Sequence, residues 1–328
     1  MNIYFAPLEG ITDSIYRNIH SRYFGNISKY YMPFISPNAD MRLNNRERRA
    51  LSASIGQNYH CVPQVLTKDP LAFVAAADML AEFGFSEVNL NLGCPSGTVT
   101  GKGKGSGMLR DIPALENFLT EIFNKVNGIS VSVKTRIGFA STSEWNGILN
   151  VLEKFPFSEI TVHPRTRTEF YKGECHSELF DLCDMDRFSY VYNGDINSPA
   201  DAIEIYNRYP SLNAVMCGRG LVANPSLGEV INGGENASVE RLCAFHNALL
   251  EAYVQDRPVN AALGHMSEIM FYMSSCFVDS KKWLKKMQKA RSIADYCDAS
   301  STMFETCELK IEPYFSSVSD LGSSIPVI

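Results

Sequence analysis

Residues 87–95 read EVNLNLGCP, and the fold class follows from this stretch and its surroundings. Residues 87–92 form a short run with a β-strand pattern, and Gly93 and Pro95 then mark a turn. Residues 71–83 before the run (LAFVAAADMLAEF) and residues 114–126 after it carry apolar side chains at helical spacing. The region therefore predicts a strand between two helices, with Cys94 on the turn that ends the strand.

Further β-like runs lie along the chain, and most are followed by a segment long enough for a helix. They cover residues 3–6, 27–32, 62–66, 131–136, 159–163, 190–193 and 214–217. Together with residues 87–92 they give a repeated strand–helix alternation that is typical of a (β/α)8 TIM barrel, whose usual size is roughly 250 residues. A doubly wound open sheet gives a similar alternation but usually has fewer strands, so it is the second candidate fold.

The pattern changes after Gly233 and Gly234, because residues 239–304 contain no β-like run and show helical periodicity. We therefore predict an α/β barrel domain over residues 1–235 and a small all-helical C-terminal domain over residues 236–310. Residues 311–328 contain serine and proline, and we predict that they form a peripheral tail.

The composition excludes several classes of protein. Hydrophobic residues make up 45% of the chain, enough for a substantial core, yet no apolar run reaches the ~18 residues of a membrane span. The first residues lack a basic segment followed by a hydrophobic one, so we expect no secretion signal. The 9 cysteines have no paired spacing, which favours free thiols in a reducing cytosol over disulfides or a metal site. We expect a monomeric cytoplasmic protein without metal or membrane association.

The net charge of −6 and the isoelectric point of about 5.6 count against a broad nucleic-acid-binding surface, which normally leaves a basic footprint. Any RNA-binding surface on this chain must therefore be a local basic patch on an acidic body.

Polar residues cluster where the predicted strands end. In a TIM barrel these carboxyl ends surround the active site, so we expect the side chains to converge on one cavity. Such convergence favours an enzyme over a purely structural barrel. The residues are Gln64, Asn89, Asn91, Cys94, Lys134, Arg136, His163, Arg165, Asn193, Gly194, Asp195, Gly218, Arg219 and Gly220.

The last two predicted strands end in Asn193-Gly194-Asp195 and Gly218-Arg219-Gly220. Loops at these positions often form a phosphate site, because glycines let backbone N–H groups approach the oxygens and an arginine adds charge. Either segment alone fits an ordinary turn with a surface charge. The two together favour a phosphate site.

Cys94 lies between a glycine and a proline on the face where cofactor and substrate are expected, which does not fit a cysteine packed in a core. With an ordinary pKa of ~8.5 its thiol is mostly protonated at neutral pH and can act as an acid. Lys134 is expected nearby, where it would lower that pKa, and its own buried charge requires an anionic partner. The residue type leaves proton donation and nucleophilic attack both open.

The glycine-rich residues 101–107 fit neither the dinucleotide-binding nor the phosphate-binding loop pattern. They predict either a loop able to order over a substrate or a plain flexible linker. His163 ends a strand, and it either donates a hydrogen bond to a bound ring or caps the strand.

Basic residues gather in two further places. Arg165, Arg167 and Lys172 form either a basic rim beside the pocket or a solvated loop. The helical domain carries a lysine stripe, predicted to lie on the helix face opposite Trp283, Met287, Ala290 and Ala294. This helix is either an ordinary surface helix or a site for the phosphate backbone of a nucleic acid. The stripe consists of Lys281, Lys282, Lys285, Lys286 and Lys289.

The chain resembles the tRNA-dihydrouridine synthases from residue 6 to about residue 294. The motifs that carry this resemblance are specific through their order and spacing rather than individually. They are APLEGITD (6–13), VPQV (62–65), NLGCP (91–95), VKTRIG (133–138), VHPRT (162–166), YKG (171–173), NGDI (193–196) and GRG (218–220).

The resemblance implies an FMN-bearing barrel followed by a helical tRNA-binding domain. Residues near the flavin ring and ribityl chain would be Pro7, Leu8, Glu9, Gln64, Lys134 and His163. Residues at the phosphate end would be Asn193, Gly194, Asp195, Gly218 and Arg219. Asn91 would contact the target uracil, and Cys94 would be the catalytic acid. Expected RNA or substrate contacts are Arg136, Arg165, Arg167, Lys282, Lys285 and Lys286.

The implied reaction reduces FMN with NADPH and passes a hydride to C6 of a flipped-out uridine in tRNA, while Cys94 protonates C5. Two alternatives remain open. A free-pyrimidine flavoprotein similar to dihydroorotate dehydrogenase shares the barrel and FMN but has no need of the helical domain. A tRNA-binding protein without catalytic activity would have no need of Cys94, Lys134 and His163.

Overall fold

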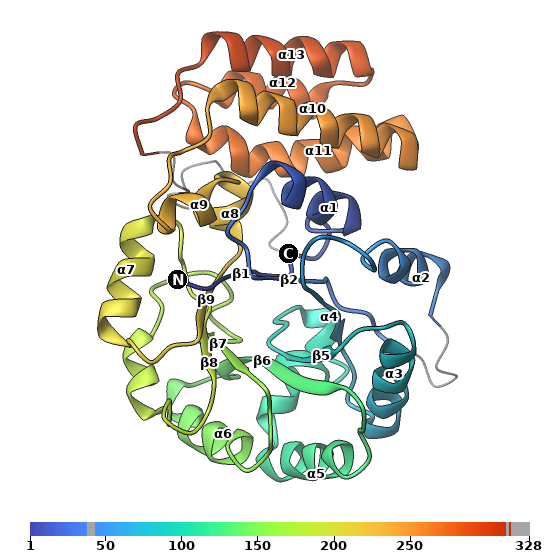
Figure 1. Ribbon diagram of the computed structural model, residues 1–328, viewed down its shortest axis with the longest axis vertical. Coiled ribbons are helices and arrows are strands. Elements are labelled where there is room, and N and C mark those ends of the chain that lie inside the picture. The colour runs from blue at the N-terminus through green and yellow to red at the C-terminus, as the bar shows by residue number, and fades with distance from the viewer. Residues whose placement is uncertain (38–42, 313–314, 316–328) are drawn as a thin grey trace.

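The computed structural model describes residues 1–37, 43–312 and 315. Short parallel strands form its centre and helices surround them (Figure 1). The strands are β1 (Ile3–Phe5), β2 (Lys29–Tyr31), β3 (Cys61–Val62), β4 (Gln64–Val65), β5 (Glu87–Leu92), β6 (Ser130–Gly138), β7 (Ile160–Thr166), β8 (Tyr190–Tyr192) and β9 (Ala214–Cys217). Every predicted strand is present.

The sheet closes into a barrel, which confirms the predicted fold class. Its strand order is β3-β2-β1-β9-β8-β7-β6-β5-β4, and every pairing is parallel. The strands at the two ends of this order, β3 and β4, are halves of the single run predicted over residues 62–66. Pro63 separates them because proline has no N–H for the ladder, while its carbonyl still accepts a hydrogen bond from Asn89 at 2.9 Å.

Most of the helices around the barrel begin at a residue whose side chain caps the helix, although α4 and α6 do not. Asp69 caps α3 with hydrogen bonds to Leu71 and Ala72, and Asp111 caps α5, and both helices have a proline in the first turn. The α-helices up to the last strand are α1 (Ser14–Tyr23), α2 (Asn45–Ser52), α3 (Pro70–Glu82), α4 (Gly97–Thr100), α5 (Ile112–Phe123), α6 (Trp145–Leu152) and α7 (Pro199–Arg208). Short 3-10 helices are η1 (Gly105–Arg110), η2 (Thr142–Glu144) and η3 (Ser177–Leu182).

As predicted, the described residues after β9 form helices and no strand, apart from an isolated β-bridge between Phe277 and Leu309. The long helices lie together beside α1, at the top of Figure 1. Its elements are α8 (Arg219–Ala223), α9 (Leu227–Ile231), α10 (Val239–Asp256), α11 (Val259–Met273), η4 (Ser274–Cys276), α12 (Lys281–Lys289) and α13 (Ile293–Thr306). The domain boundary at residues 235 and 236 falls between α9 and α10 and stays a prediction. The predicted tail, residues 311–328, lies mostly outside the described residues.

Polar contacts fasten α10 to the start of α1. Asp13, the N-cap of α1, accepts hydrogen bonds from Tyr253 at 2.9 Å and Arg257 at 3.0 Å. Phe245 of α10 packs edge-on against Tyr16 of α1 with ring centroids 5.7 Å apart. The helical segment is therefore held against the barrel by both polar and apolar contacts.

The lysine-rich segment differs from the single amphipathic helix that the sequence predicted. The helix ends at Lys289, and α13 starts after Ser292, whose extended backbone and side chain cap the new helix. Ala294 therefore belongs to the next helix, and the buried residues of α12 are Leu284 and Met287. Trp283 does not oppose the stripe, because its ring lies under the ammonium groups of Lys282 and Lys286 at 5.0 and 4.3 Å.

The barrel interior is apolar on one side and polar on the other. Strands β1, β2, β3, β8 and β9 contribute a separate buried cluster, which consists of Tyr4, Ala6, Tyr31, Val62, Val191, Ala214 and Met216. Between β5, β6 and β7 the buried side chains are instead polar, among them Glu87, Asn89, Ser132 and Glu159.

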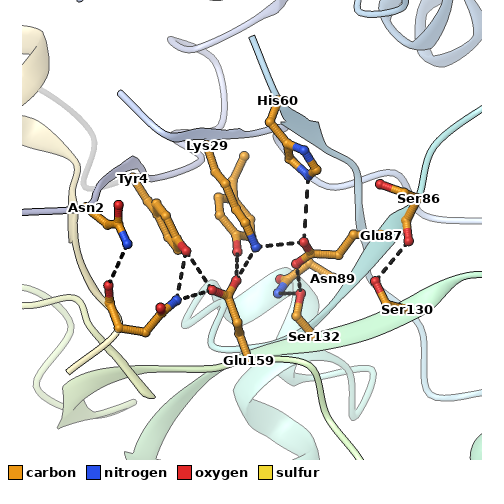
Figure 2. A network of polar contacts seen from close by, with 12 residues as sticks. Asn2, Tyr4, Lys29, His60, Ser86, Glu87, Asn89, Ser130, Ser132 and Glu159 are labelled. Carbon is orange, nitrogen blue, oxygen red and sulfur yellow. Dashed lines mark hydrogen bonds and ion pairs between the residues drawn. The ribbon is translucent and has the colours of Figure 1, made fainter. Parts of the chain in front are cut away.

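A charged cluster fills the end of the barrel where the strands begin (Figure 2). Lys29 contacts the carboxylates of both Glu87, at 2.8 Å, and Glu159. Tyr4 donates a further hydrogen bond to Glu159 at 2.6 Å. Burial alone would raise the pKa of Glu87, but hydrogen bonds and charge from His60 and Lys29 bring it below its ordinary value.

We predict that Lys29→Met destabilises the protein by about 2–3 kcal/mol at pH 7, somewhat less than for a fully buried pair because Lys29 keeps some exposure. Two carboxylates would lose their shared cation, and the pKa of Glu87 would rise. The lowered pKa of folded-state Glu87 stabilises the wild-type protein above the ordinary value of 4.5, and this advantage should shrink as the pH falls below 4.5. Urea unfolding at pH 7 and pH 4 measures both effects.

The matched control is Lys154→Met, which breaks an exposed ion pair with Glu116 at 2.6 Å and should cost less than about 1 kcal/mol. Equal losses in the two variants would contradict a stabilising role for the buried cluster.

Candidate active site at the carboxyl end of the barrel

Two adjoining pockets open at the carboxyl ends of the strands, and they share walls formed by Pro7, Leu8, Lys134, His163, Tyr171 and Arg219. The first pocket is further lined by Glu9, Pro33, Phe34, Gln64, Asn91, Gly93, Cys94, Pro95, Arg136, Lys172, Phe271 and Tyr272. The second is further lined by Ala6, Asn193, Asp195, Ile196, Asn197, Met216 and Gly218. Side chains from distant parts of the sequence thus meet in one elongated cavity.

The turn that carries Cys94 is held from three sides. Asn91 Oδ1 accepts hydrogen bonds from the backbone N–H groups of Gly93, at 3.0 Å, and Cys94, at 2.9 Å. Arg136 Nε donates to the Gly93 carbonyl at 3.0 Å, and Arg167 Nε donates to the Pro95 carbonyl at 3.1 Å. The thiol therefore sits on a fixed turn at the pocket wall.

The glycine-rich residues 101–107 pack against this turn and are not a plain linker. Gly105 has φ +57°, and a Cβ there would lie 3.0 Å from the Cys94 carbonyl and 3.1 Å from Cys94 Cβ. Ser106 Oγ donates to the same carbonyl at 2.8 Å. Glycine at position 105 thus permits both the left-handed backbone and the close approach.

Burial raises the pKa of the Cys94 thiol, and the smaller opposing effects of Arg136 and Lys134 do not reverse this. Lys134 does act to lower the pKa, as the sequence had suggested, but burial outweighs it and the net direction is upward. A thiol with a raised pKa is protonated at neutral pH. At neutral pH the group therefore carries a proton that it can donate, and the thiolate form is disfavoured.

Lys134 carries an amine without a fixed counter-charge. Burial, with the charge of Arg136 as a second cause, lowers its pKa to about 7. Within residues 1–37, 43–312 and 315, no hydrogen bond or ion pair reaches its Nζ atom. A bound ligand with negative charge or exposed acceptor atoms would supply the missing partner.

His163 is neutral and has a defined tautomer. Burial, followed by the charges of Arg136 and Lys134, brings its pKa well below the ordinary value. Arg165 Nη1 lies 3.4 Å from His163 Nε2, and a guanidinium can only donate. The ring proton therefore belongs on Nδ1, which makes that atom a hydrogen-bond donor.

The second pocket has an excess of positive charge at its end. Asp195 accepts from Arg165 at 2.5 Å and from Arg219 at 2.6 Å, so two cations face one carboxylate. Burial acts to raise the pKa of Asp195, but the two arginines hold it below its ordinary value. Gly194 allows close packing, since a Cβ there would lie 2.7 Å from Cys175 Sγ. The remaining positive charge fits an anionic group such as a phosphate.

Several predicted site residues lie outside the pocket lining. Arg165 and Arg167 are bonded to Asp195 and to the Pro95 carbonyl, and Gly194 lies behind the second pocket. The lysines of α12 (Lys282, Lys285 and Lys286) are exposed and contribute nothing to either pocket. Leu8 does line the pocket. Its backbone N–H, however, donates to Thr12 Oγ1 at 2.8 Å and is therefore already occupied.

Several pocket residues were not predicted. The ring of Tyr171 contacts the guanidinium groups of Arg136 and Arg219, which lie 5.4 and 5.2 Å from its centroid. Tyr171 belongs to a motif to which no role had been assigned. Phe271 and Tyr272 come from α11 and close the pocket from the helical side. Their sequence context carries only helical periodicity, so no local signal identified them.

Comparisons with known proteins show the family to which this chain belongs. Residues 4–318 match the family described as Dihydrouridine synthase (Dus). A protein of Staphylococcus epidermidis named "Probable tRNA-dihydrouridine synthase" is 30% identical over 269 residues, covering 76% of this chain and 78% of the relative. A Bacillus subtilis protein named "Probable tRNA-dihydrouridine synthase 2" is 29% identical over 228 residues, covering 67% of this chain and 69% of the relative.

Among solved structures, morphinone reductase superimposes with a TM-score of 0.51 and 11% identity, covering 72% of this chain and 87% of that chain. At this identity the likeness concerns the barrel fold alone.

Two features are absent from the residues that the structure describes. None of their helices is long and apolar enough to cross a membrane, and no cluster of His, Cys, Asp or Glu is arranged to hold a metal ion.

We predict that iodoacetamide alkylates Cys94 slowly at pH 7–8 and that the rate rises with a midpoint above its ordinary pKa of ~8.5, because only the thiolate reacts and burial disfavours it. Peptide mass spectrometry after timed alkylation follows Cys94 separately from the other cysteines. A midpoint below the ordinary value would show that the positive charges around the pocket outweigh burial.

Proposed function

Because this chain belongs to the dihydrouridine synthase family, we propose that it reduces the C5=C6 bond of uridines in tRNA to 5,6-dihydrouridine. The enzyme is a flavin-dependent oxidoreductase, and we propose FMN as its flavin and NADPH as its reductant. The observation that carries the proposal is the position of the protonated Cys94 thiol on the wall of a cavity with an excess of positive charge. The same cavity contains the Lys134 amine, which has no partner among the described residues.

The residues of the two pockets fit FMN. The first pocket would hold the ring beside Pro7, Leu8, Glu9 and Gln64, and Lys134 and His163 Nδ1 would supply donors to its acceptor atoms. The second would hold the phosphate end, with Asn193, Asp195, Gly218 and Arg219 on its wall and Gly194 behind it. The orphaned Nζ atom of Lys134 supports this fit most directly, because it needs an acceptor that the described residues do not provide.

When bound, FMN supplies hydride chemistry, carrying two electrons from NADPH to C6 of the uracil ring. Cys94 donates its proton to C5, so that one hydride and one proton add across the double bond. The thiolate that remains is stabilised by the nearby charges of Arg136 and Lys134, which already act to lower the Cys94 pKa. Asn91, on the same pocket wall, is our proposed contact to the uracil.

We propose that tRNA lies across α12 and the pocket mouth. Lys282, Lys285 and Lys286 are exposed and would contact phosphates of the RNA backbone. Arg136, Arg165 and Arg167 donate to protein acceptors, so we assign them to support of the pocket rather than to primary RNA contact. The reaction would take place in the cytoplasm, with the chain acting as a monomer.

We predict that Cys94→Ala lowers the rate of dihydrouridine formation by roughly 10²–10⁴-fold, the range expected for removal of a general acid. The assay combines the protein with FMN, NADPH and unmodified tRNA and quantifies dihydrouridine by mass spectrometry of the digested RNA. Because Cys94 must be protonated, loss of its proton should lower the wild-type rate at alkaline pH, above the raised pKa of the thiol.

The matched control is Cys243→Ala, which changes a partly buried cysteine on α10 outside both pockets. Free uridine serves as the second substrate and should not be reduced at a comparable rate, in contrast to a free-pyrimidine enzyme. Full activity of Cys94→Ala, or no product with the wild-type protein, would overturn the proposal.

A further inference from the structure

A continuous series of hydrogen bonds, called the row below, runs through the barrel interior from Glu87 to Cys94. Its members are Glu87, Ser132, Asn89, Gln64, Asn91 and the backbone of Gly93 and Cys94. Ser132 Oγ donates to Glu87 at 2.6 Å, and Asn89 Nδ2 donates to Ser132 Oγ at 2.9 Å (Figure 2). Gln64 Nε2 donates to Asn89 Oδ1 at 2.7 Å, and Asn91 Nδ2 donates to Gln64 Oε1 at 2.7 Å. The row ends where Asn91 Oδ1 accepts from the Gly93 and Cys94 amides.

The direction of this row is fixed at both ends. The Glu87 carboxylate, whose pKa is below its ordinary value, can only accept. The backbone N–H groups of Gly93 and Cys94 can only donate. Every hydrogen bond between these ends must therefore point toward Glu87. Reversal of any one carboxamide would set donor against donor or acceptor against acceptor at a buried position.

Burial makes the constraint strong. Asn89 and Ser132 are 0% exposed and Gln64 is 1% exposed, so water does not offer these groups alternative partners. The strand register supports the same arrangement, because Gln64, Asn89 and Ser132 are paired neighbours across β4, β5 and β6. The row is thus built into the barrel rather than into a surface loop.

We propose that Glu87, Ser132 and Asn89 are positioning residues that orient the carboxamides of Gln64 and Asn91 and the turn of Cys94. None of the three lines either pocket, whereas Gln64, Asn91 and Cys94 all do. The row leaves Gln64 and Asn91 each with one N–H that donates to none of the described residues and can donate to a ligand. The pocket therefore recognises carbonyl acceptors such as those of a pyrimidine or a flavin ring. This proposal rests on the proposed function for its kinetic test but not for its geometry.

The decisive variants are Ser132→Ala and Asn89→Leu, which interrupt the row without touching the pocket. Thr161→Val is the matched control, because Thr161 is also buried in the barrel, pairs in register with Lys134, and has a hydroxyl without a partner among the described residues. Ser132→Thr restores the hydroxyl and should behave as the wild type. If Asn89→Leu does not fold, Ser132→Ala alone decides.

We expect kcat on tRNA to fall by about tenfold in Ser132→Ala, corresponding to the ~1.4 kcal/mol of a lost buried hydrogen bond. KM for tRNA should stay within roughly twofold, since no RNA-contacting side chain is altered. Flavin saturation is verified by visible absorbance. A value of kcat equal to that of Thr161→Val, or a change confined to KM, would overturn the proposal.

An independent readout uses the cofactor-free protein. Loss of the row should loosen the Cys94 turn, so iodoacetamide should alkylate Cys94 several-fold faster in Ser132→Ala and Asn89→Leu than in Thr161→Val. Equal alkylation rates in these variants and in Thr161→Val would contradict the proposal, whatever the kcat values are. If the wild type made no dihydrouridine while the alkylation rates differed as expected, the proposed function would fail and the positioning role would stand.

Discussion

A polar group buried in a protein interior must find a partner, and this barrel places such groups along one side from its amino end to its carboxyl end. At the bottom, Lys29 joins Glu87 and Glu159. Higher up, carboxamides on β4 and β5 pair with one another and with Ser132. Apart from Lys29 at the start of β2, the interior side chains contributed by β1, β2, β3, β8 and β9 are apolar or tyrosine. The polar side leads directly to the pocket wall that carries Cys94.

The electrostatics of the pocket also depend on which charged groups have a partner of opposite charge. Lys134, Arg136, Arg165 and Arg219 gather on a chain whose net charge is −6, and Asp195 neutralises only part of their charge. This concentration, together with burial, keeps His163 neutral and brings the pKa of Lys134 to about 7. An acidic protein thereby presents one local site for an anionic ligand, as the composition required of any nucleic-acid-binding or phosphate-binding surface.

The sequence predicted those parts of the molecule that depend on local pattern. The strands are short runs with clear turn signals, and the polar residues at their ends were recognisable because parallel strands bring their carboxyl ends together. Features that depend on tertiary contact were missed. Phe271 and Tyr272 enter the pocket only because α11 packs over the barrel mouth. The break after Lys289 depends on capping by Ser292, which competes with the helical periodicity that continues through it.

The pairing partners of buried polar groups were also beyond prediction. Asn89 and Asn91 were recognised as strand-end residues, but their bonds to Ser132 and Gln64 depend on strand register, which no sequence pattern supplied.

The most direct measurement of the central claim is a crystal structure of the protein with FMN. Our account predicts the flavin ring beside Leu8 and Lys134, the phosphate beside Arg219, and the Cys94 thiol facing the space above the ring. Flavin bound elsewhere on the chain, or a Cys94 thiol turned away from the ring into the packing of residues 101–107, would contradict it.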